Sequence, residues 1–245
     1  IDDCEMKITH VIRGEDHISN TPKQILVGQA LGLLSMPKFA HLPLILGSDR
    51  SKLSKREASV SVNEYREAGY LPEALINFIA LLGWNPGTNE EILSLKELIK
   101  KFDLSKVQKG GAIFNTEKLD WLNGHYLRKL SIDELAEKAI PFLEKNKLIE
   151  KNSYNLEYIK KVLSLEQSRL KKLGEIGERL TFFFKQPKYE PELLIWRDMF
   201  FKDITVSLNV ALSALNQITE SNFTCDNLEK ILLKETERAK NKDKG

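Results

Sequence analysis

Three cations and a serine fall within five residues at Lys52-Leu53-Ser54-Lys55-Arg56, directly after a turn sequence at Gly47-Ser48-Asp49. Two lysines three residues apart can converge on a polyanion, because the lysine ammonium is a compact charge on a flexible stem. Cations placed in advance in this way stabilise the charge that builds on a phosphoryl group in a transition state. Taken alone, however, a short basic segment is more often a solvated loop. The interpretation therefore depends on what surrounds it.

A second group of chemically capable residues, Arg13-Gly14-Glu15-Asp16-His17, follows a run of apolar residues that predicts a strand. Ligands of open α/β sheets bind at the carboxyl ends of strands, and an arginine there can hold a carboxylate through two parallel hydrogen bonds. The competing interpretation of Arg13 is a surface ion pair with Glu15 or Asp16. Asn20-Thr21-Pro22 is most simply a helix cap, although a helix N-terminus can also face an anion.

Two strands and a series of helices are expected to position these segments. Alternating β-branched residues at 6–12 and the apolar run at 41–46 predict the strands, the second of which is limited by Pro43. A candidate N-cap at Thr21, with Pro22 in the first turn, predicts a helix between the two strands. Capping boxes are expected at Ser61 with Glu64, Ser94 with Glu97 and Ser131 with Glu134. Further helices are expected at 62–68, 72–83, 95–102, 116–123, 132–145, 156–173, 175–184, 191–199, 204–217 and 226–240.

The predicted fold class is therefore mainly α, with a small α/β piece at the front of the chain. The 245 residues are 42% hydrophobic and 29% charged, which is typical of a globular protein. A net charge of +2 is too small to indicate nucleic acid by itself, so any basic binding face must be local. Cys4 and Cys225 stand in no metal-ligand spacing, so we expect reduced thiols, no zinc site and a cytoplasmic location. No apolar run approaches the roughly 20 residues of a membrane helix, and no membrane partner is expected.

Several longer stretches, in order, resemble glutamyl-tRNA synthetase of the bacterial or organellar type, a class I aminoacyl-tRNA synthetase. The stretches are ITHVIRGEDHISNTPKQ from Ile8, FAHLPLILGSDRSKLSKR from Phe39, YREAGYLPEALINFIALLGW from Tyr65 and KGGAIFNTEKLDWLNGHYL from Lys109. The resemblance implies the remnant of a Rossmann-type catalytic domain at 1–60, a helical stem-contact region at 61–130 and a helical anticodon-binding domain at 131–245.

The resemblance also implies roles for individual residues. Lys52 to Arg56 would be this family's version of the K-M-S-K-S loop, in which Lys55 contacts ATP and Lys52 supports it. Ser54 and Asp16 would complete the ATP-binding residues. Arg13 would contact the glutamate substrate, and His17 would line the same pocket. ATP with Mg²⁺ would be a substrate of the complete enzyme.

The family's other ATP signature, an H-I-G-H-like segment, does not occur in this sequence. The resemblance places it in the first half of the catalytic domain, so we expect that the chain begins inside that domain. We also expect that it ends before the anticodon-binding domain is complete. Because both sides of the nucleotide site are needed to position ATP, the chain alone is predicted to be inactive.

Clusters of basic residues predict contacts to tRNA phosphates. One cluster comprises Lys96, Lys100, Lys101, Lys106 and Lys109, although a solvated helix surface is an equal alternative. Between 151 and 185 eight cations outnumber four acids, and LEQSRLKKL from Leu165 resembles the anticodon-reading helix of the family. Gln167 stands where some members that accept only the glutamate tRNA carry arginine. The expected partners are L-glutamate, tRNA(Glu) and, with glutamine at 167, also tRNA(Gln), bound by a monomer.

Two alternatives remain open beside the ligase. One is a paralogue that glutamylates a modified tRNA base, although such paralogues lack the anticodon domain and this chain continues for 115 residues after Leu130. The other is a non-catalytic tRNA-binding module derived from the synthetase. Residues encoded upstream of Ile1 would separate these alternatives.

Overall fold

The computed structural model describes residues 1–33, 35–51, 53, 61–195 and 200–242, and it omits the side chains of residues 220 and 237–242. The chain forms two compact units, Ile1–Gln186 and Pro187–Gly245. The architecture is mainly α with two small parallel sheets, which confirms the predicted fold class. No helix among the described residues is both long enough and apolar enough to cross a membrane.

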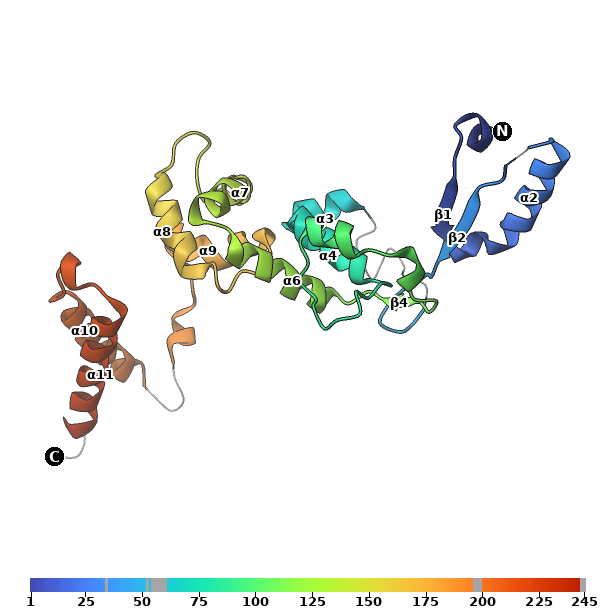
Figure 1. Cartoon of the computed structure of the whole chain (residues 1–245). Helices are drawn as coiled ribbons and strands as arrows, with labels where there is room; N and C mark the ends of the chain where they lie inside the picture. The colour runs from blue at the N-terminus through green and yellow to red at the C-terminus, as the bar shows by residue number, and fades with distance from the viewer. Residues whose placement is uncertain (34, 52, 54–60, 196–199, 243–245) are drawn as a thin grey trace. The chain divides into compact units, whose positions relative to one another are not determined.

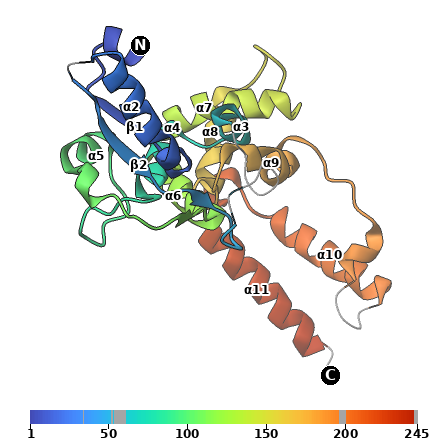
Figure 2. The ribbon, with the colours of Figure 1, turned by 90° about the vertical axis from the view of Figure 1, so that its right-hand side faces the viewer.

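The front of the first unit is a small α/β element that ends in the segment Arg13 to His17. Helix α1 (Asp2–Glu5) leads to strand β1 (His10–Gly14), a 3₁₀ turn η1 (Glu15–Asn20), helix α2 (Thr21–Ala30) and strand β2 (Lys38–Leu42). Strands β1 and β2 are parallel, with Arg13 opposite His41 in the register. Both strands and α2 lie side by side in two views (Figures 1 and 2). The carboxyl ends of β1 and β2 therefore meet at one edge.

Both predicted strands differ from the observed ones. The strand expected at 6–12 begins only at His10, because Asp2–Glu5 is helical and Lys7 takes a left-handed φ of 56°. The strand expected at 41–46 is two strands, β2 and β3 (Ile45–Leu46), which are separated at Pro43 and Leu44. Proline has no N–H for a ladder, which explains the break at that point. Strand β3 pairs with β4 (Ala112–Ile113), a strand that the sequence did not indicate.

Helices fill the rest of the first unit. They are α3 (Val62–Ala68), α4 (Pro72–Leu81), α5 (Leu95–Lys101), α6 (Thr116–Lys129), α7 (Ile132–Lys145), α8 (Leu156–Glu166) and α9 (Ile176–Phe184), with 3₁₀ turns η2 (Leu104–Lys106) and η3 (Leu173–Glu175). The capping boxes at Ser94 with Glu97 and Ser131 with Glu134 are both present. Ser61 caps α3 through the N–H of Asn63 instead.

Two helix predictions were wrong in length. The helix expected at 116–123 continues to Lys129, and its second half buries Leu127. The helix expected at 156–173 ends at Glu166, and Gln167 is its C-cap. The side chain of Gln167 bonds to carbonyls of a distant segment, which stabilises an end that local propensity does not indicate.

Among the described residues of the first unit, the buried apolar side chains all lie between Leu71 and Leu180. Their largest cluster joins α4, α6, α7, α8 and α9, and smaller clusters surround Phe78 and Trp84. In the described part of residues 1–60, by contrast, the only buried residues are the glycines Gly28 and Gly47. The described residues of the α/β element thus form no buried apolar core of their own.

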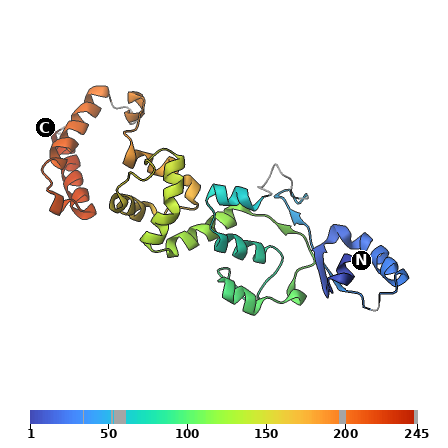
Figure 3. The same ribbon diagram turned by 90° about the horizontal axis from the view of Figure 1, so that it is seen from above.

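The second unit is a helical pair. It contains the 3₁₀ turns η4 (Pro191–Leu194) and η5 (Glu220–Asn222) and the helices α10 (Phe201–Leu215) and α11 (Cys225–Lys242). Helices α10 and α11 contact one another, as the orange and red ribbons of Figure 3 show. The helix expected at 191–199 is only a 3₁₀ turn over the described residues at its start.

Candidate functional site

Arg13 and His41 are joined by Thr21 at the carboxyl edge of the β1–β2 pair. Arg13 Nη2 donates to Thr21 Oγ1 at 2.7 Å, and Thr21 Oγ1 lies 3.0 Å from His41 Nε2. Thr21 was expected to be the N-cap of α2, but Asn20 takes that position and Thr21 is the first helical residue. Its hydroxyl is therefore available to the strand edge instead of capping the helix.

The guanidinium of Arg13 makes several contacts, but its Nε–H has no described hydrogen-bond partner. Its central carbon lies 5.6 Å from the centroid of the Phe39 ring. Nη2 also reaches the carbonyl of His17 at 3.5 Å, whereas Nε is buried and has no hydrogen-bond partner among the described residues. A buried donor without an acceptor is costly, and a carboxylate or phosphate oxygen would satisfy it.

The side chains of Glu15, Asp16 and His17 form no described hydrogen bond or ion pair with this arginine. Among the described salt bridges none joins Arg13 to Glu15 or Asp16, which contradicts the alternative of a surface ion pair. Glu15 Oε1 accepts from the N–H of Leu44 at 3.1 Å and so fixes the corner after β2. Asp16 and His17 are exposed in η1, and His17 Nδ1 lies 3.2 Å from Asn20 Nδ2. Both side chains are accessible to a ligand.

Most of the predicted phosphate loop lies outside the described residues. This applies to Lys52, Ser54, Lys55 and Arg56. On its N-terminal side the chain makes a tight turn, in which Arg50 has a φ of 65° and Gly47 N–H donates to the carbonyl of Ser51 at 2.9 Å. Leu53 N–H then donates to the carbonyl of Ile45 at 3.0 Å, which ties the start of the basic segment to β3.

The predicted phosphate-contacting lysines of the stem-contact region differ in their partners. Lys101 contacts Glu90, and Lys118, which is outside the predicted cluster, pairs with the next residue, Glu91, at 2.6 Å. The other predicted members are exposed and form no ion pair with any described residue: Lys96, Lys100, Lys106 and Lys109. These four side chains are available to an anionic partner.

Half of the eight cations between 151 and 185 likewise form no ion pair with a described residue. Four of these cations form ion pairs, namely Lys160, Arg169, Lys172 and Arg179. The remaining four are exposed and form no described ion pair: Lys151, Lys161, Lys171 and Lys185. The local positive field predicted for this segment therefore has side chains that can supply it.

Gln167, the candidate for reading the anticodon, is engaged by its own chain. Its Nε2 donates to the carbonyl of Leu127 at 3.0 Å and to that of Leu130 at 2.9 Å. Both amide hydrogens therefore satisfy carbonyls at the C-terminal end of α6. Only Oε1 remains without a described partner and can accept a hydrogen bond from a base.

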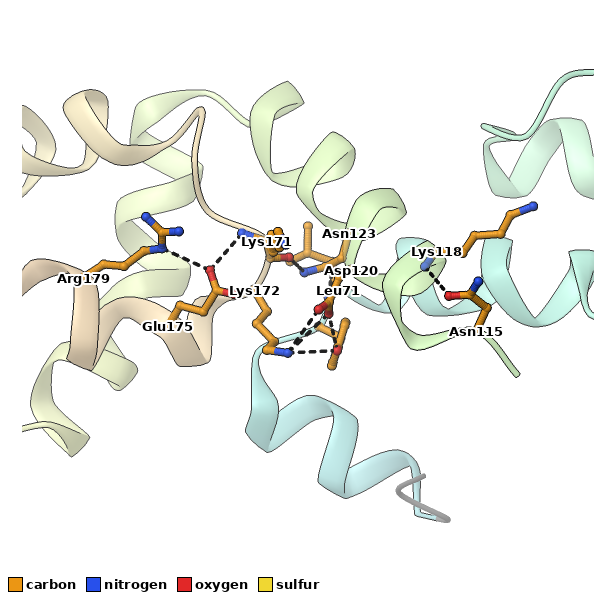
Figure 4. A network of polar contacts seen from close by, with 10 residues as sticks. Leu71, Asn115, Lys118, Asp120, Asn123, Lys171, Lys172, Glu175 and Arg179 are labelled. Atoms are coloured by element: carbon orange, nitrogen blue, oxygen red, sulfur yellow. Dashed lines mark hydrogen bonds and ion pairs between the residues drawn. The ribbon is translucent and has the colours of Figure 1, made fainter. Parts of the chain in front are cut away.

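A network of polar contacts fixes the segment that follows Gln167 (Figure 4). Asn123 accepts from the N–H of Leu71 at 2.8 Å and donates to the carbonyl of Lys171 at 2.6 Å. Asp120 accepts from the hydroxyl of Tyr70 and pairs with Lys172 at 3.3 Å. Burial and the hydrogen bond to Asp120 raise the pKa of Tyr70 well above its usual range. This network joins the start of α4, helix α6 and η3.

Three residues at these sites were not identified from the sequence. Thr21 was considered as a cap or as part of a helix N-terminus that faces an anion, without a role for its hydroxyl at the strand edge, and His41 and Asn123 were given no role. The parallel register that puts His41 opposite Arg13 was the missing information. No cluster of three or more His, Cys, Asp or Glu side chains that could hold a metal ion occurs within the described ranges.

Two family models match the chain in succession. Residues 1–121 match the model described as tRNA synthetases class I (E and Q), catalytic domain, and residues 134–243 match the anticodon binding domain model. The boundaries expected at 60 and 130 are tested by neither match and stay predictions.

Individual relatives cover both parts together. The glutamate–tRNA ligase of Aquifex aeolicus is 50% identical over 241 residues, which are 98% of this chain and 49% of that protein. Glutamate–tRNA ligase 1 of Caldanaerobacter subterraneus subsp. tengcongensis is 42% identical over 236 residues, 96% of this chain and 49% of that protein. The chain thus spans about half the length of the relatives it matches.

Solved structures give the same correspondence. A glutamate tRNA ligase from Elizabethkingia meningosepticum, in complex with its amino acid, superposes with a TM-score of 0.72 at 33% identity, covering 94% of this chain and 48% of that one. Glutamate-tRNA synthetase from Elizabethkingia anophelis superposes with a TM-score of 0.73 at 32% identity, covering 94% and 47%.

Proposed function

This chain belongs to the glutamate–tRNA ligase family of class I synthetases, and from this premise we propose that the complete protein activates glutamate with ATP and joins it to tRNA. The observation that carries the proposal is the 50% identity to a glutamate–tRNA ligase over 241 residues, together with the two family matches. The proposed setting is translation in the cytoplasm.

Arg13 is the proposed contact for the glutamate carboxylate. Its support is chemical, since a guanidinium with a buried, unsatisfied Nε–H needs an oxygen acceptor. His17 and Asp16 are exposed next to it, in agreement with proposed contacts to the amino acid and to the adenosine part of ATP.

Lys55 and Lys52, with Ser54 between them, are the proposed binding residues for the ATP phosphates. The two ammonium groups would neutralise charge on the ATP phosphates as the adenylyl group passes to the glutamate carboxylate and pyrophosphate leaves, and Mg²⁺ would enter with the nucleotide as part of the substrate. In support, the preceding turn and the bond from Leu53 to Ile45 anchor the start of this loop on β3.

The tRNA is the proposed partner of the unpaired lysines between Lys96 and Lys109 and between Lys151 and Lys185. Contacts of this kind make binding sensitive to salt, because they release counterions from the RNA. Gln167 stays a proposed anticodon contact, limited to its Oε1 atom since its amide hydrogens are used within the chain.

The 245 residues by themselves are proposed to be inactive in glutamate activation. Two observations support this expectation: they span about half of their relatives, and the described residues of their α/β element form no buried apolar core. A glutamate site without such a core is poorly held in the geometry that catalysis requires.

A charging assay on the complete protein tests the proposed function. The expected result is ATP-dependent attachment of glutamate to tRNA(Glu), and with Gln167 present also to tRNA(Gln). Strict rejection of tRNA(Gln) would refute the second part alone. Binding of tRNA without any charging would favour the non-catalytic module, whereas the match to the anticodon binding domain argues against the base-modifying paralogue.

A further inference from the structure

We infer that Thr21 and His41 are positioning residues, which hold the guanidinium of Arg13 in the orientation that a carboxylate substrate requires. The inference deepens the proposed function and rests on it. Its structural basis is the continuous series of contacts from Arg13 through Thr21 to His41, at 2.7 Å and 3.0 Å.

The backbone brings these three residues together from three elements. Arg13 and His41 are register partners on parallel strands, and Thr21 opens the helix between the strands. Ligands of α/β sheets bind at this carboxyl edge. The three side chains are half-buried, so the contacts between them are partly shielded from water.

The hydroxyl of Thr21 can connect Arg13 to His41 whichever tautomer the His41 ring adopts. Its oxygen accepts from Arg13 Nη2, and its single hydrogen can go to His41 Nε2 or to the carbonyl of His17 at 3.3 Å. In the second case an Nε2–H of His41 donates to the same oxygen, which is possible because a hydroxyl accepts twice. Arg13 is therefore held in both arrangements.

Arg13 keeps a buried Nε–H without a described acceptor, while its Nη2 is fixed by Thr21. The arrangement thus fixes one nitrogen of the fork and leaves others for a ligand. Because arginine side chains lose considerable rotamer entropy on binding, an arginine that is already held binds a carboxylate with less loss.

The test uses the complete protein and glutamate-dependent ATP–pyrophosphate exchange in the presence of tRNA. Thr21→Val keeps the shape of the side chain and removes the hydroxyl, whereas Thr21→Ser keeps the hydroxyl. We expect Thr21→Val and His41→Phe to raise KM for glutamate about tenfold, with KM for ATP unchanged. Thr21→Ser should restore most of the affinity, and Gln29→Ala, an exposed residue on the same helix, should behave as the unmodified protein.

A double-mutant cycle separates positioning from an independent effect. If Thr21 acts through Arg13, Thr21→Val lowers kcat/KM for glutamate in the unmodified protein but not in an Arg13→Ala background. Equal losses in both backgrounds, equal changes in KM for ATP, or an unchanged KM in Thr21→Val would each overturn the inference. If the proposed function itself is wrong, the unmodified protein will show no glutamate-dependent exchange, which distinguishes that outcome from failure of the inference. Thermal melts of each variant identify losses that come from unfolding.

Discussion

The hydroxyl of Tyr70 donates a hydrogen bond to the carboxylate of Asp120, 50 residues further along the chain. The same carboxylate pairs with Lys172, whose ammonium also lies 5.3 Å from the centroid of the Tyr70 ring. Three distant segments therefore meet at one half-buried carboxylate. Their contact joins the start of α4 and helix α6 to the segment that leads into η3.

Replacing Tyr70 with phenylalanine should destabilise the protein by about 1–2 kcal/mol, because Asp120 loses a charge-assisted donor in a half-buried place. The measurement is the free energy of unfolding in urea. Tyr154→Phe is the matched control, since Tyr154 is exposed and its hydroxyl has no described hydrogen bond. Equal effects of the two substitutions would show that the contact does not contribute.

The same tyrosine predicts a pH dependence. Burial and then the hydrogen bond to Asp120 raise the pKa of Tyr70 above the value of about 10 in the unfolded chain. The folded state therefore keeps a proton that the unfolded state releases, so this stabilisation is complete below about pH 10 and declines as the pH rises further. The stability difference between the unmodified protein and Tyr70→Phe should shrink above about pH 10. A constant or growing difference would contradict the assignment.

Gly69 is predicted to tolerate no side chain. Its φ is +89°, and a Cβ atom there would lie 2.6 Å from the backbone nitrogen of Leu173 and closer still to that of Gly174. Gly87 has nearly the same φ, +87°, with nothing within 4 Å. Both Gly→Ala substitutions cost the left-handed strain of roughly 1–2 kcal/mol, but only Gly69→Ala must also displace backbone.

We expect Gly69→Ala to be less stable than Gly87→Ala by at least about 2 kcal/mol, as for other forced overlaps in packed regions. Denaturant unfolding of both variants measures the difference directly. Similar losses would mean that the approach of Gly69 to Gly174 can relax without cost.

Gln167 offers a test of its structural role apart from any contact to tRNA. Gln167→Glu replaces two donors with acceptors that face the carbonyls of Leu127 and Leu130, so we expect a loss of about 2 kcal/mol in unfolding free energy. Gln108→Glu, at an exposed side chain with no described hydrogen bond, should change stability little. If the two variants are equally stable, the carboxamide does not support the end of α6.

Local signals in the sequence predicted local structure well. Ser94 with Glu97 and Ser131 with Glu134 form the expected capping boxes, because both partners of each box lie within one turn. The end of α8 was missed for the opposite reason. Gln167 is held by carbonyls of residues 37 and 40 positions away, and propensity along the chain carries no information on them.

The residues of the candidate site also divide into those that local sequence identified and those whose roles depend on distant contacts. Arg13, Asp16 and His17 were identified from their order after an apolar run and from the family resemblance. The roles of Thr21 and His41 depend on the register of two parallel strands and on a helix that begins one residue earlier than its cap pattern predicted. Strand β4 was missed because two residues that pair with β3 across more than 60 positions leave no periodic pattern.

Lys55→Ala in the complete protein is the sharpest test of the proposal that this chain supplies the ATP-phosphate loop of a glutamate–tRNA ligase. Glutamate-dependent ATP–pyrophosphate exchange and the dissociation constant for tRNA(Glu) are measured on the same preparation, with Lys23→Ala as a control on an exposed helix lysine. Removal of a cation from the transition state is expected to lower exchange by about a hundredfold or more. The dissociation constant should change less than about threefold, as expected for one phosphate contact or none. Equal losses in exchange and in tRNA affinity, or full exchange activity, would contradict the account.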